Sequence, residues 1–381
     1  MKKVILLLTV CIFWFSLYIY IPFLTPFLLS LGLTAALAGI IFGAHSFTQL
    51  LLRLPVGIKS DALGRQKPFI ILGMLFTVIS SLIMYFFPSP AMLLVGNAIS
   101  GFASTMYVSF TVLYALYYPT SQTSKAMGVM SGVVEIGIFA AFMLGGILYD
   151  KSGIKALFFT SAAVAAIGLI ISFFIKEKPA PKQAVAIKDV LTVMKDRRLI
   201  VSSVLGILIK GLIFATVYSF TPKMAQDIGA NGTQVGVINA LFIAASILGA
   251  FFVATKAGKK FGYRRMGVLG FILTGAMTIS IPFIKSIPVF MAVQFMGGLG
   301  YSSLTSIFMA NAIKNFDANK KPIAMGFYQA AYSLGSALGP VLMGVFADTL
   351  HYTAAYLLIS LAAVAGVILV LAGYRKKAAT S

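Results

Sequence analysis

The chain has 381 residues, of which 60% are hydrophobic and 10% are charged. Soluble domains carry roughly 25% charged residues, so this much charge cannot cover a globule of this size and most of the surface must face lipid. The formal net charge of +21 could indicate a nucleic-acid partner, but the basic residues lie in short segments between apolar runs. The composition therefore excludes a soluble protein and gives no support to nucleic-acid binding.

Apolar runs of about 20 residues recur along the chain and predict transmembrane helices. The runs are continuous, whereas barrel strands alternate, so the expected fold class is an all-α polytopic membrane protein. We place twelve spans, at residues 4–29, 35–55, 68–87, 91–117, 126–149, 155–175, 199–222, 234–255, 266–284, 288–313, 323–346 and 353–374.

Basic residues are concentrated on one side of these spans. If the N-terminus is inside, most of the 30 Lys and Arg residues fall in inner segments, which is the positive-inside rule. We therefore expect a multi-pass protein of the plasma membrane with both termini in the cytoplasm. The basic start, Lys2-Lys3, is similar to a signal peptide, but its apolar run is long and many spans follow it, so we interpret it as the first span.

The chain repeats itself at an offset near 200 residues. Tyr18 and Pro22 correspond to Tyr218 and Pro222. After a three-residue deletion in the second repeat, Gly32 and Gly64 correspond to Gly229 and Gly262. The polar stretch 176–198 separates the repeats and predicts a linker, with room for a short amphipathic helix on the membrane surface. The expected domains are a six-helix bundle at 1–175, the linker at 176–198 and a second six-helix bundle at 199–381. The best-matched positions are Gly137, Gly146 and Asp150 against Gly335, Gly344 and Asp348.

A polar, glycine-containing segment, Pro55–Lys67, joins the second and third spans. It follows the pattern G-x-x-x-D-x-x-G-R-x-K and is interpreted as a loop. This segment resembles the signature loop between helices 2 and 3 of the major facilitator superfamily, whose members are secondary transporters. The resemblance covers essentially the whole chain. It implies twelve helices in two pseudo-symmetric bundles that expose a central solute pocket to one side of the membrane at a time.

In that family the loop is a latch on the cytoplasmic side. The resemblance assigns the gating role to Gly57, Asp61, Gly64, Arg65 and Lys67; the alternative is a loop that only holds positive charge inside. The corresponding segment of the second repeat has Lys259 where the acid would stand, so a second latch would have to work differently.

Two other motifs are compared with those of drug–proton antiporters of this family. Their helix-5 pattern of glycines and proline is altered here at Ala141 and Phe142, and the fuller match is in the eleventh span at Gly339-Pro340. Small residues of this kind favour close helix packing. Their helix-4 arginine aligns with Asn97, which argues against a standard proton relay through that helix.

Ionisable residues inside spans are the candidates for proton coupling, because burying a charge costs roughly 2.5–3.5 kcal/mol on insertion scales. Glu135 is the first candidate, and its counterpart in the second repeat is Ser333. Glu135 could also be a structural acid paired with Lys210, and Lys210 could hold an anionic group of a solute. His45 is the second candidate, since histidine titrates near physiological pH; the alternative is a hydrogen-bonded interhelical histidine. His45, Gln49 and Arg53 share one helix face, and Arg53 is assigned to the latch region.

The resemblance places the substrate cavity between helices 1, 4, 7 and 10. Aromatic and methionine side chains near mid-membrane suit partly apolar solutes; any one of them could instead face lipid. The candidates are Trp14, Tyr18, Met106, Tyr107, Phe110, Lys210, Phe214, Tyr218, Tyr301 and Thr305.

The expected function is secondary active transport by alternating access, with proton-coupled efflux of a small amphiphilic compound or metabolite as the first hypothesis. The alternative is uptake or facilitated exchange of a sugar, organic anion or amino-acid-like solute. We expect no enzyme activity, cofactor or metal, and a monomer whose partners are a small-molecule substrate, protons and the lipid bilayer. The single cysteine, Cys11, excludes an intrachain disulfide.

Overall fold

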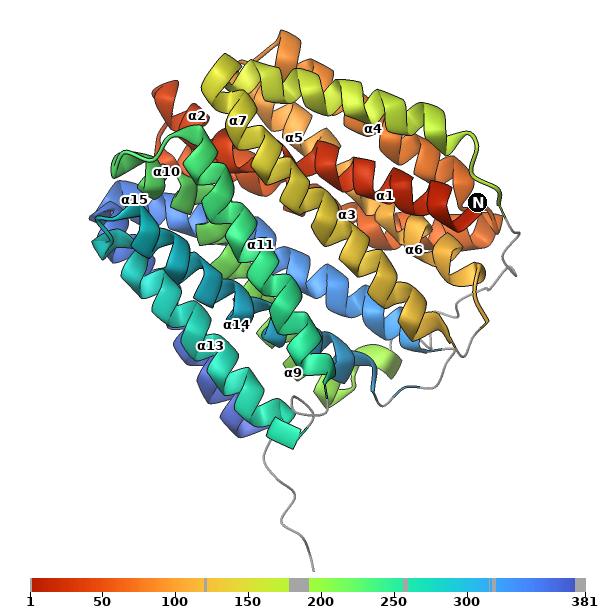
Figure 1. Cartoon of the computed structure of the whole chain (residues 1–381). Coiled ribbons are helices and arrows are strands. Elements are labelled where there is room, and N and C mark those ends of the chain that lie inside the picture. The colour runs from red at the N-terminus through yellow and green to blue at the C-terminus, as the bar shows by residue number, and fades with distance from the viewer. Residues whose placement is uncertain are drawn as a thin grey trace, which may run out of the picture.

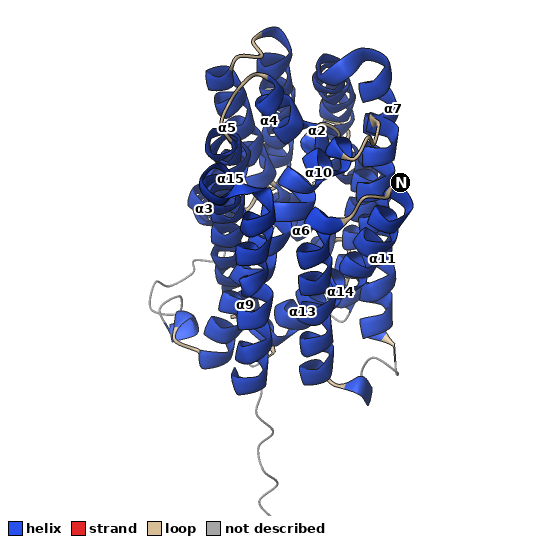
Figure 2. Ribbon diagram, turned by 90° about the vertical axis from the view of Figure 1, so that its left-hand side faces the viewer, coloured by secondary structure: helices blue, strands red, loops and turns tan. Residues whose placement is uncertain are grey.

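A computed structural model of the chain describes residues 2–119, 122–177, 192–255, 260–314, 316 and 320–373. Within these ranges the side chains of residues 61, 123, 124, 254 and 322 are not described. Long helices pack side by side in a single bundle (Figure 1), and no described residue belongs to a strand (Figure 2).

The helices of the first repeat are α1 (Lys2–Tyr18), α2 (Ile21–Ser30), α3 (Ala35–Leu63), α4 (Lys67–Phe86), α5 (Pro90–Thr105), α6 (Tyr107–Leu116) and α7 (Thr123–Ser172). Those of the second are α9 (Arg197–Ala215), the π-helical segment η2 (Thr216–Phe220), α10 (Thr221–Asp227), α11 (Gly232–Ala254), α13 (Tyr263–Ser280), the 3-10 turn η3 (Ile281–Phe283), α14 (Ile287–Ile313) and α15 (Lys321–Gly373).

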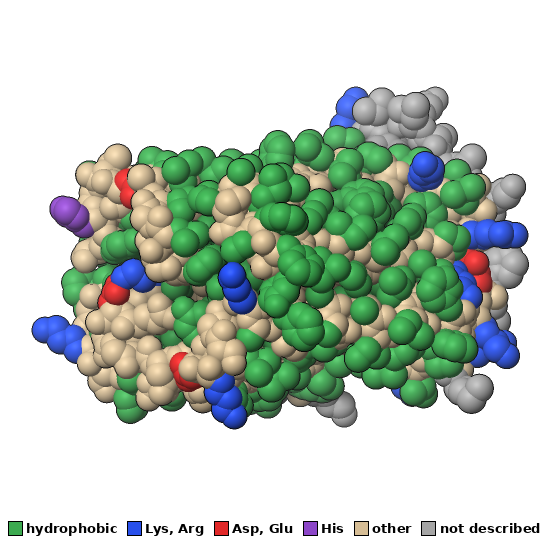
Figure 3. All heavy atoms as spheres, turned by 90° about the horizontal axis from the view of Figure 1, so that it is seen from above, with side chains coloured by type: hydrophobic (Ala, Val, Ile, Leu, Met, Phe, Trp, Pro, Cys, Tyr) green, Lys and Arg blue, Asp and Glu red, His purple; other side chains and the backbone are tan. Residues whose placement is uncertain are grey.

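Ten helical stretches in the described ranges are long and apolar enough to cross a membrane. Two of them, in α7 and α15, are about twice the usual length, and each is broken by a residue with non-helical backbone angles, Gly153 and His351. Counting each of these two as a pair recovers the predicted number of spans. Hydrophobic side chains cover the middle of the face in Figure 3, and most charged side chains on that face lie toward its two ends. An all-α multi-pass membrane protein is therefore confirmed.

The first helix of each repeat is interrupted at the same place. The break between α1 and α2 precedes Pro22, and η2 precedes α10, which contains Pro222. Proline has no N–H and its ring clashes with the carbonyl four residues earlier, here that of Tyr18 and of Tyr218. Pro22 and Pro222 therefore cannot donate the usual helical hydrogen bond to the carbonyls of two tyrosines that correspond to each other in the repeats.

The segment that joins the second and third spans is mostly helical, which corrects the prediction of a loop over Pro55–Lys67. Helix α3 continues through Pro55 and Gly57 to Leu63. The turn is confined to residues 64–66, where Gly64 takes a φ of 62°. Glycine accepts that conformation at no steric cost, so one glycine makes the turn and Gly57 is not needed for it.

The repeats also share their unusual backbone angles. Positive φ occurs at Gly32 and Gly229, at Gly64 and Gly262, and at Gly153 and His351. The first two pairs are in the register that the sequence comparison predicted. The third pair continues it, with the difference that histidine replaces glycine in the second repeat.

His351 should therefore carry backbone strain. Its φ of 68° and ψ of 159° lie in a region that is accessible almost only to glycine and costs other residues about 1–3 kcal/mol. Because Gly in the unfolded chain is more flexible and offsets part of the gain, we expect His351→Gly to raise the free energy of unfolding by about 1 kcal/mol. Thermal unfolding of the purified protein in detergent measures this.

The control is Thr349→Gly, two residues earlier in regular, exposed helix. There glycine should lower the stability by roughly 1 kcal/mol. Equal effects of the two substitutions would show that His351 is not strained.

Candidate functional site

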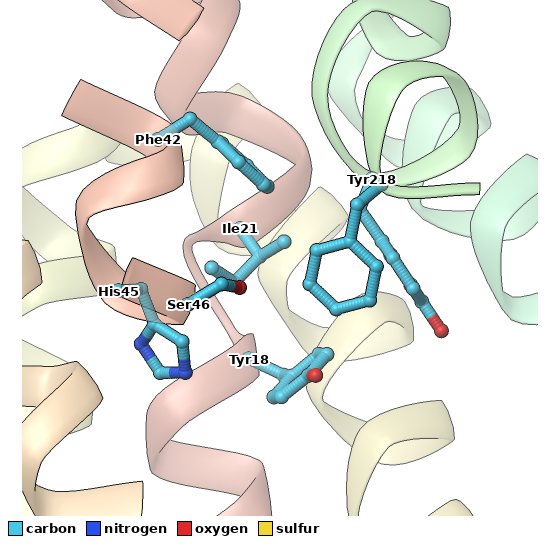
Figure 4. Close-up of a pocket in the computed structure, with 7 residues that line it drawn as sticks. Tyr18, Ile21, Phe42, His45, Ser46 and Tyr218 are labelled. Carbon is cyan, nitrogen blue, oxygen red and sulfur yellow. The ribbon is translucent and has the colours of Figure 1, made fainter. Parts of the chain in front are cut away.

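Two adjoining cavities lie between helices from the two repeats. The larger, called here the polar cavity, has a volume of about 60 Å³ and is lined by Trp14, Tyr18, His45, Ser46, Gln49, Arg53, Lys210, Phe214, Tyr332 and Ser336. The smaller, called the side pocket, has about 10 Å³ and is lined by Tyr18, Ile21, Phe42, His45, Ser46, Phe214 and Tyr218. Figure 4 shows the side pocket, with His45 and Ser46 on α3 facing Tyr18 and Tyr218 across it. The polar cavity has room for only a few water molecules in this conformation.

Helix α3 contributes a polar stripe to the polar cavity. His45 Nδ1 lies 2.7 Å from Ser100 Oγ, which is the contact expected of an interhelical structural histidine. Gln49 donates from Nε2 to Ser104 Oγ at 2.8 Å. Arg53, which the sequence analysis assigned to the latch region, is 6% exposed and lines the cavity. The assignment was wrong because α3 runs on past Arg53 to Leu63, which places this side chain inside the bundle.

Two side chains of α15 complete this side of the cavity. Tyr332 accepts a long hydrogen bond of 3.4 Å from Arg53 Nη1, and Ser336 lines the cavity near it. Neither residue was predicted. The only signal in the sequence is that they are four residues apart on one helix face, but a tyrosine and a serine in an apolar helix are too common to single out.

Lys210 of α9 reaches the cavity from the second repeat. Its Nζ donates to Tyr301 Oη at 2.5 Å and lies 5.2–5.6 Å from the ring centres of Phe214, Tyr301 and Tyr332. Glu135 of α7 is half-buried and within electrostatic reach of Lys210. The two do not form a salt bridge within 4.0 Å; across the described residues, that criterion is met by Lys223 and Asp227.

Aromatic rings line the walls of the two cavities. The paired tyrosines Tyr18 and Tyr218 pack edge to face, with ring centres 5.9 Å apart. Trp14 lies 5.4 Å from Tyr18 and 5.2 Å from Tyr107, again between ring centres. Tyr218 also packs against Phe214. The predicted aromatic residues of α1, α9 and η2 are therefore brought together around one space.

Five of the ten predicted cavity residues do not line either cavity. Tyr107 and Tyr301 contact the lining residues Trp14 and Lys210, and the other three are Met106, Phe110 and Thr305. Met106 packs with Val56, Phe69 and Phe102, and Phe110 stacks on Phe13 in the core. Thr305 donates to the backbone of its own helix. For Met106 and Phe110 the reason is the interruption between α5 and α6 at Met106, since the facing of side chains beyond such a break does not follow from helical periodicity.

The proposed latch is only partly visible. The side chain of Asp61 lies outside the described residues, as does Lys259 of the second repeat. Gly57 lies in α3, where an added Cβ would only touch Val108 at 3.9 Å, and Arg65 is exposed. The latch role of these residues stays a prediction.

Lys67 and Glu177 tie the start of α4 to the segment that follows α7. The Glu177 carboxylate accepts hydrogen bonds from the backbone N–H groups of Gln66 and Lys67, the latter at 3.0 Å. Lys67 Nζ donates to the Phe173 carbonyl at 2.7 Å. An acid at a helix N-terminus satisfies free N–H groups and the helix dipole. Sequence reasoning missed Glu177 because it is more than 100 residues from the helix that it caps.

Asn97, which replaces the helix-4 arginine, has a structural position. It is fully buried and donates from Nδ2 to the carbonyls of Ile41 and Phe42 at 2.7 and 3.0 Å. It therefore holds α5 against α3 and does not line either cavity.

Two aspartates in matching positions of the repeats each cap a helix of the other repeat. Asp150 accepts hydrogen bonds from the backbone of Gly232 and Thr233 at 2.6 and 2.7 Å, at the start of α11. Asp348 accepts from the backbone of Ala35 and Ala36 at 2.9 and 2.8 Å, at the start of α3. These contacts lie at the end of the bundle opposite the end where α1 and α4 begin, and this end is called the far end. The contacts of Asp150 and Asp348 are called the two far-end caps.

Membrane spans around a small cavity with charged and aromatic walls are typical of a membrane transporter. Comparison with known proteins agrees. The sequence profile described as Major Facilitator Superfamily matches residues 6–224 and 204–381. The chain belongs to the Major Facilitator Superfamily, as the resemblance of its motif segment indicated.

Relatives with known sequences or structures cover most of the chain. It is 25% identical over 343 residues to an uncharacterized MFS-type transporter of Methanocaldococcus jannaschii, covering 86% of each chain. It is 26% identical over 373 residues to multidrug resistance protein 2 of Bacillus subtilis, covering 92% of this chain and 90% of the relative. The crystal structure of a mutant form of the nucleoside transporter NupG superposes with a TM-score of 0.76 at 13% identity, covering 97% of this chain and 100% of the other. The last likeness shows the fold.

Proposed function

We propose that the protein is a secondary active transporter that moves a small amphiphilic solute through the polar cavity by alternating access. The observation that carries this proposal is the cavity itself, where Arg53 and Lys210 from different repeats reach one space between aromatic rings. Charged side chains are costly inside a membrane and are kept where they act on a solute or ion. We assign solute contact to the aromatic residues that line the cavity and proton coupling to Glu135, with His45 as the second candidate.

Alternating access is supported by how the repeats pack. Near the far-end caps, α3 contacts α15 so closely that a Cβ on Gly39 would lie 2.2 Å from the Pro340 carbonyl oxygen. A Cβ on Gly236 of α11 would lie 2.4 Å from the Phe142 carbonyl oxygen of α7. Toward the other end of α7 and α15, a Cβ on Gly128 or Gly326 would meet nothing within 4 Å. We propose that this conformation is closed at the far end and open at the other.

The proposed topology follows from the distribution of charge. We propose that both termini and the linker at 176–198 are cytoplasmic and that the far end faces the outside of the plasma membrane. We also propose that the protein acts as a monomer. The bundles at 1–175 and 199–381 are the units that rock against each other, and the conformation described above is then inward-facing.

Efflux is the direction that the relatives favour. Multidrug resistance protein 2 of B. subtilis is named for resistance, and export is how a transporter lowers the internal concentration of a toxic compound. In that case protons enter as the solute leaves, and the solute and the proton must compete for the carrier.

Uptake or exchange of an organic anion or another polar solute is the second candidate, and a specific observation favours it. The polar cavity is lined by two cationic side chains, Arg53 and Lys210, and none of its lining residues is acidic. A cation-selective exporter would need the opposite charge at this place.

Transport in proteoliposomes tests the proposal. Purified protein is reconstituted, a pH gradient is imposed, and movement of a panel of radiolabelled amphiphilic anions, amines and neutral compounds is measured. We expect at least one compound to move only when the gradient is present, and its direction relative to the proton gradient separates efflux from uptake. Absence of gradient-dependent movement, with intact counterflow of the same compound, would contradict proton coupling.

A further inference from the structure

The polar cavity is rich in hydrogen-bond donors that lack acceptors. Arg53 is 6% exposed, and its one hydrogen bond to a described residue is the 3.4 Å contact of Nη1 with Tyr332 Oη. Its Nε is buried and has no partner among the described residues. A guanidinium has five N–H donors and no acceptor, so most of these donors have no partner among the described residues.

Trp14 adds a second donor of this kind. The indole Nε1 is buried without a partner in the described part of the chain, and the residue lines the same cavity. An indole can only donate. Leaving a buried donor unpaired is destabilising, more so for a charged group, so these two side chains together call for an acceptor that the surrounding helices do not supply.

Lys210 places a second positive charge close to the first. Tyr332 lies between them, since it accepts from Arg53 and its ring centre is 5.2 Å from Lys210 Nζ. Within the described ranges Lys210 makes one hydrogen bond, to Tyr301, and an ammonium has three N–H donors. Glu135 is within electrostatic reach of Lys210, but among the described residues the two form no salt bridge within 4.0 Å.

We infer that the solute is an organic anion whose carboxylate binds between Arg53 and Lys210, with its apolar body against the rings of Tyr18 and Phe214. Guanidinium groups bind carboxylates through two parallel N–H···O bonds. The side-on form of this pair uses Nε and one Nη, and Nε of Arg53 has no partner among the described residues. The inference rests on the proposed function because it takes the polar cavity as the solute site, and it names the chemical class that the site recognises.

Binding can be measured directly, because Trp14 is the only tryptophan of the chain and lines the cavity. Trp14 fluorescence of the purified protein in detergent is followed during titration with 4-phenylbutyrate, 4-phenylbutylamine and 4-phenylbutanol. These probes share a body and differ in the charge of the head group. We expect the carboxylate to bind at least about tenfold more tightly than the amine or the alcohol, as a charge-assisted hydrogen-bonded pair would produce.

Variants identify the residues responsible. Arg53→Gln and Lys210→Gln should each reduce the preference for the carboxylate by about tenfold, whereas Arg53→Lys and Lys210→Arg should keep part of it. Lys223→Gln is the matched control, because Lys223 pairs with Asp227 away from the cavity. Size-exclusion profiles and thermal unfolding exclude misfolded variants. If a glutamine variant fails to fold, Arg53→Lys or Lys210→Arg is measured in its place.

Equal binding of the three probes, tighter binding of the amine, or no binding of any probe at millimolar concentration overturns the inference. Gradient-driven movement of an amine or a neutral compound in the proteoliposome assay would leave the proposed function standing and remove only the anion. Loss of all gradient-driven movement, with the preference for the carboxylate still present, would contradict the proposed function and leave the anion site standing.

Discussion

Glu135→Gln should abolish transport driven by a pH gradient while solute counterflow continues. Glutamine has the shape of the protonated acid but cannot release a proton, so it holds the carrier in one protonation state. Glu135 is half-buried on α7 and acts electrostatically on Lys210 and on tyrosines at the cavity. Gradient-driven transport is measured in proteoliposomes with and without an imposed pH gradient. Counterflow is measured as the exchange of labelled for unlabelled solute at equal pH.

Glu177→Gln is the control, since Glu135 and Glu177 are the two glutamates of the chain. Glu177 caps α4 at the end of the bundle where the chain starts, so this variant should keep gradient-driven transport. A Glu135→Gln protein with the full response to the gradient would remove Glu135 from the coupling role and leave His45 as the candidate.

The same variant also separates the two proposed directions. Exchange of protons for solute requires the two to compete, so a permanently neutral residue 135 would bind the solute more weakly, and counterflow would continue only at a higher solute concentration. Transport of proton and solute in the same direction requires that the binding of one strengthens the binding of the other. If the solute is an anion, removing the negative charge beside Lys210 strengthens its binding, and the carrier would move proton and anion together. Tighter binding of 4-phenylbutyrate by Glu135→Gln would therefore favour uptake, and weaker binding would favour efflux.

The spans and the repeat could be predicted from sequence because both depend on local patterns. A run of about 20 apolar residues crosses a membrane wherever it stands in the fold. The glycines at positions 32, 64, 229 and 262 were matched as repeat positions, and each has the positive φ that only glycine takes readily. The extent of α3 was predicted less well, because Pro55 and the polar residues after it are typical of a loop in water but are compatible with helix at the end of a span.

The site could be predicted only where one helix carries the signal. His45, Gln49 and Arg53 share a face of α3, and that face does line the cavity. The partner of Arg53 could not be found, because Tyr332 is 279 residues away and nothing local marks it. The aspartates at 150 and 348 were matched with each other, yet the helices that they cap become visible only when the repeats are packed together.

The two far-end caps should control how easily the outer side opens. Each aspartate joins helices of different repeats, since Asp150 of α7 caps α11 and Asp348 of α15 caps α3. Removing a capping side chain costs about 0.5–2 kcal/mol, and the helix dipole adds to the effect of an acid. The two sites share no partners, so the losses should add to about 1–4 kcal/mol and favour the outward-open conformation by at least several-fold.

Thiol labelling of the double variant Asp150→Ala/Asp348→Ala measures this shift. In a background with Cys11→Ser, Ser46→Cys places the only thiol at a position that lines both cavities. We expect a membrane-impermeant maleimide added outside cells to label it about tenfold faster in the double variant, because the outer path is open more often. Asp227→Ala is the matched control, since Asp227 pairs with Lys223 within α10 and joins no two repeats.

Labelling at the same rate in the double variant and the control would show that the far-end caps do not hold the repeats together. Faster labelling in the double variant has a further consequence for transport. A carrier biased toward the outward-open conformation returns slowly to the inward-facing one, so net gradient-driven transport should fall although the cavity residues are unchanged. The combination of faster labelling and slower transport would assign the caps to the conformational step, because a defect in solute binding would lower transport without exposing Ser46→Cys to the outside.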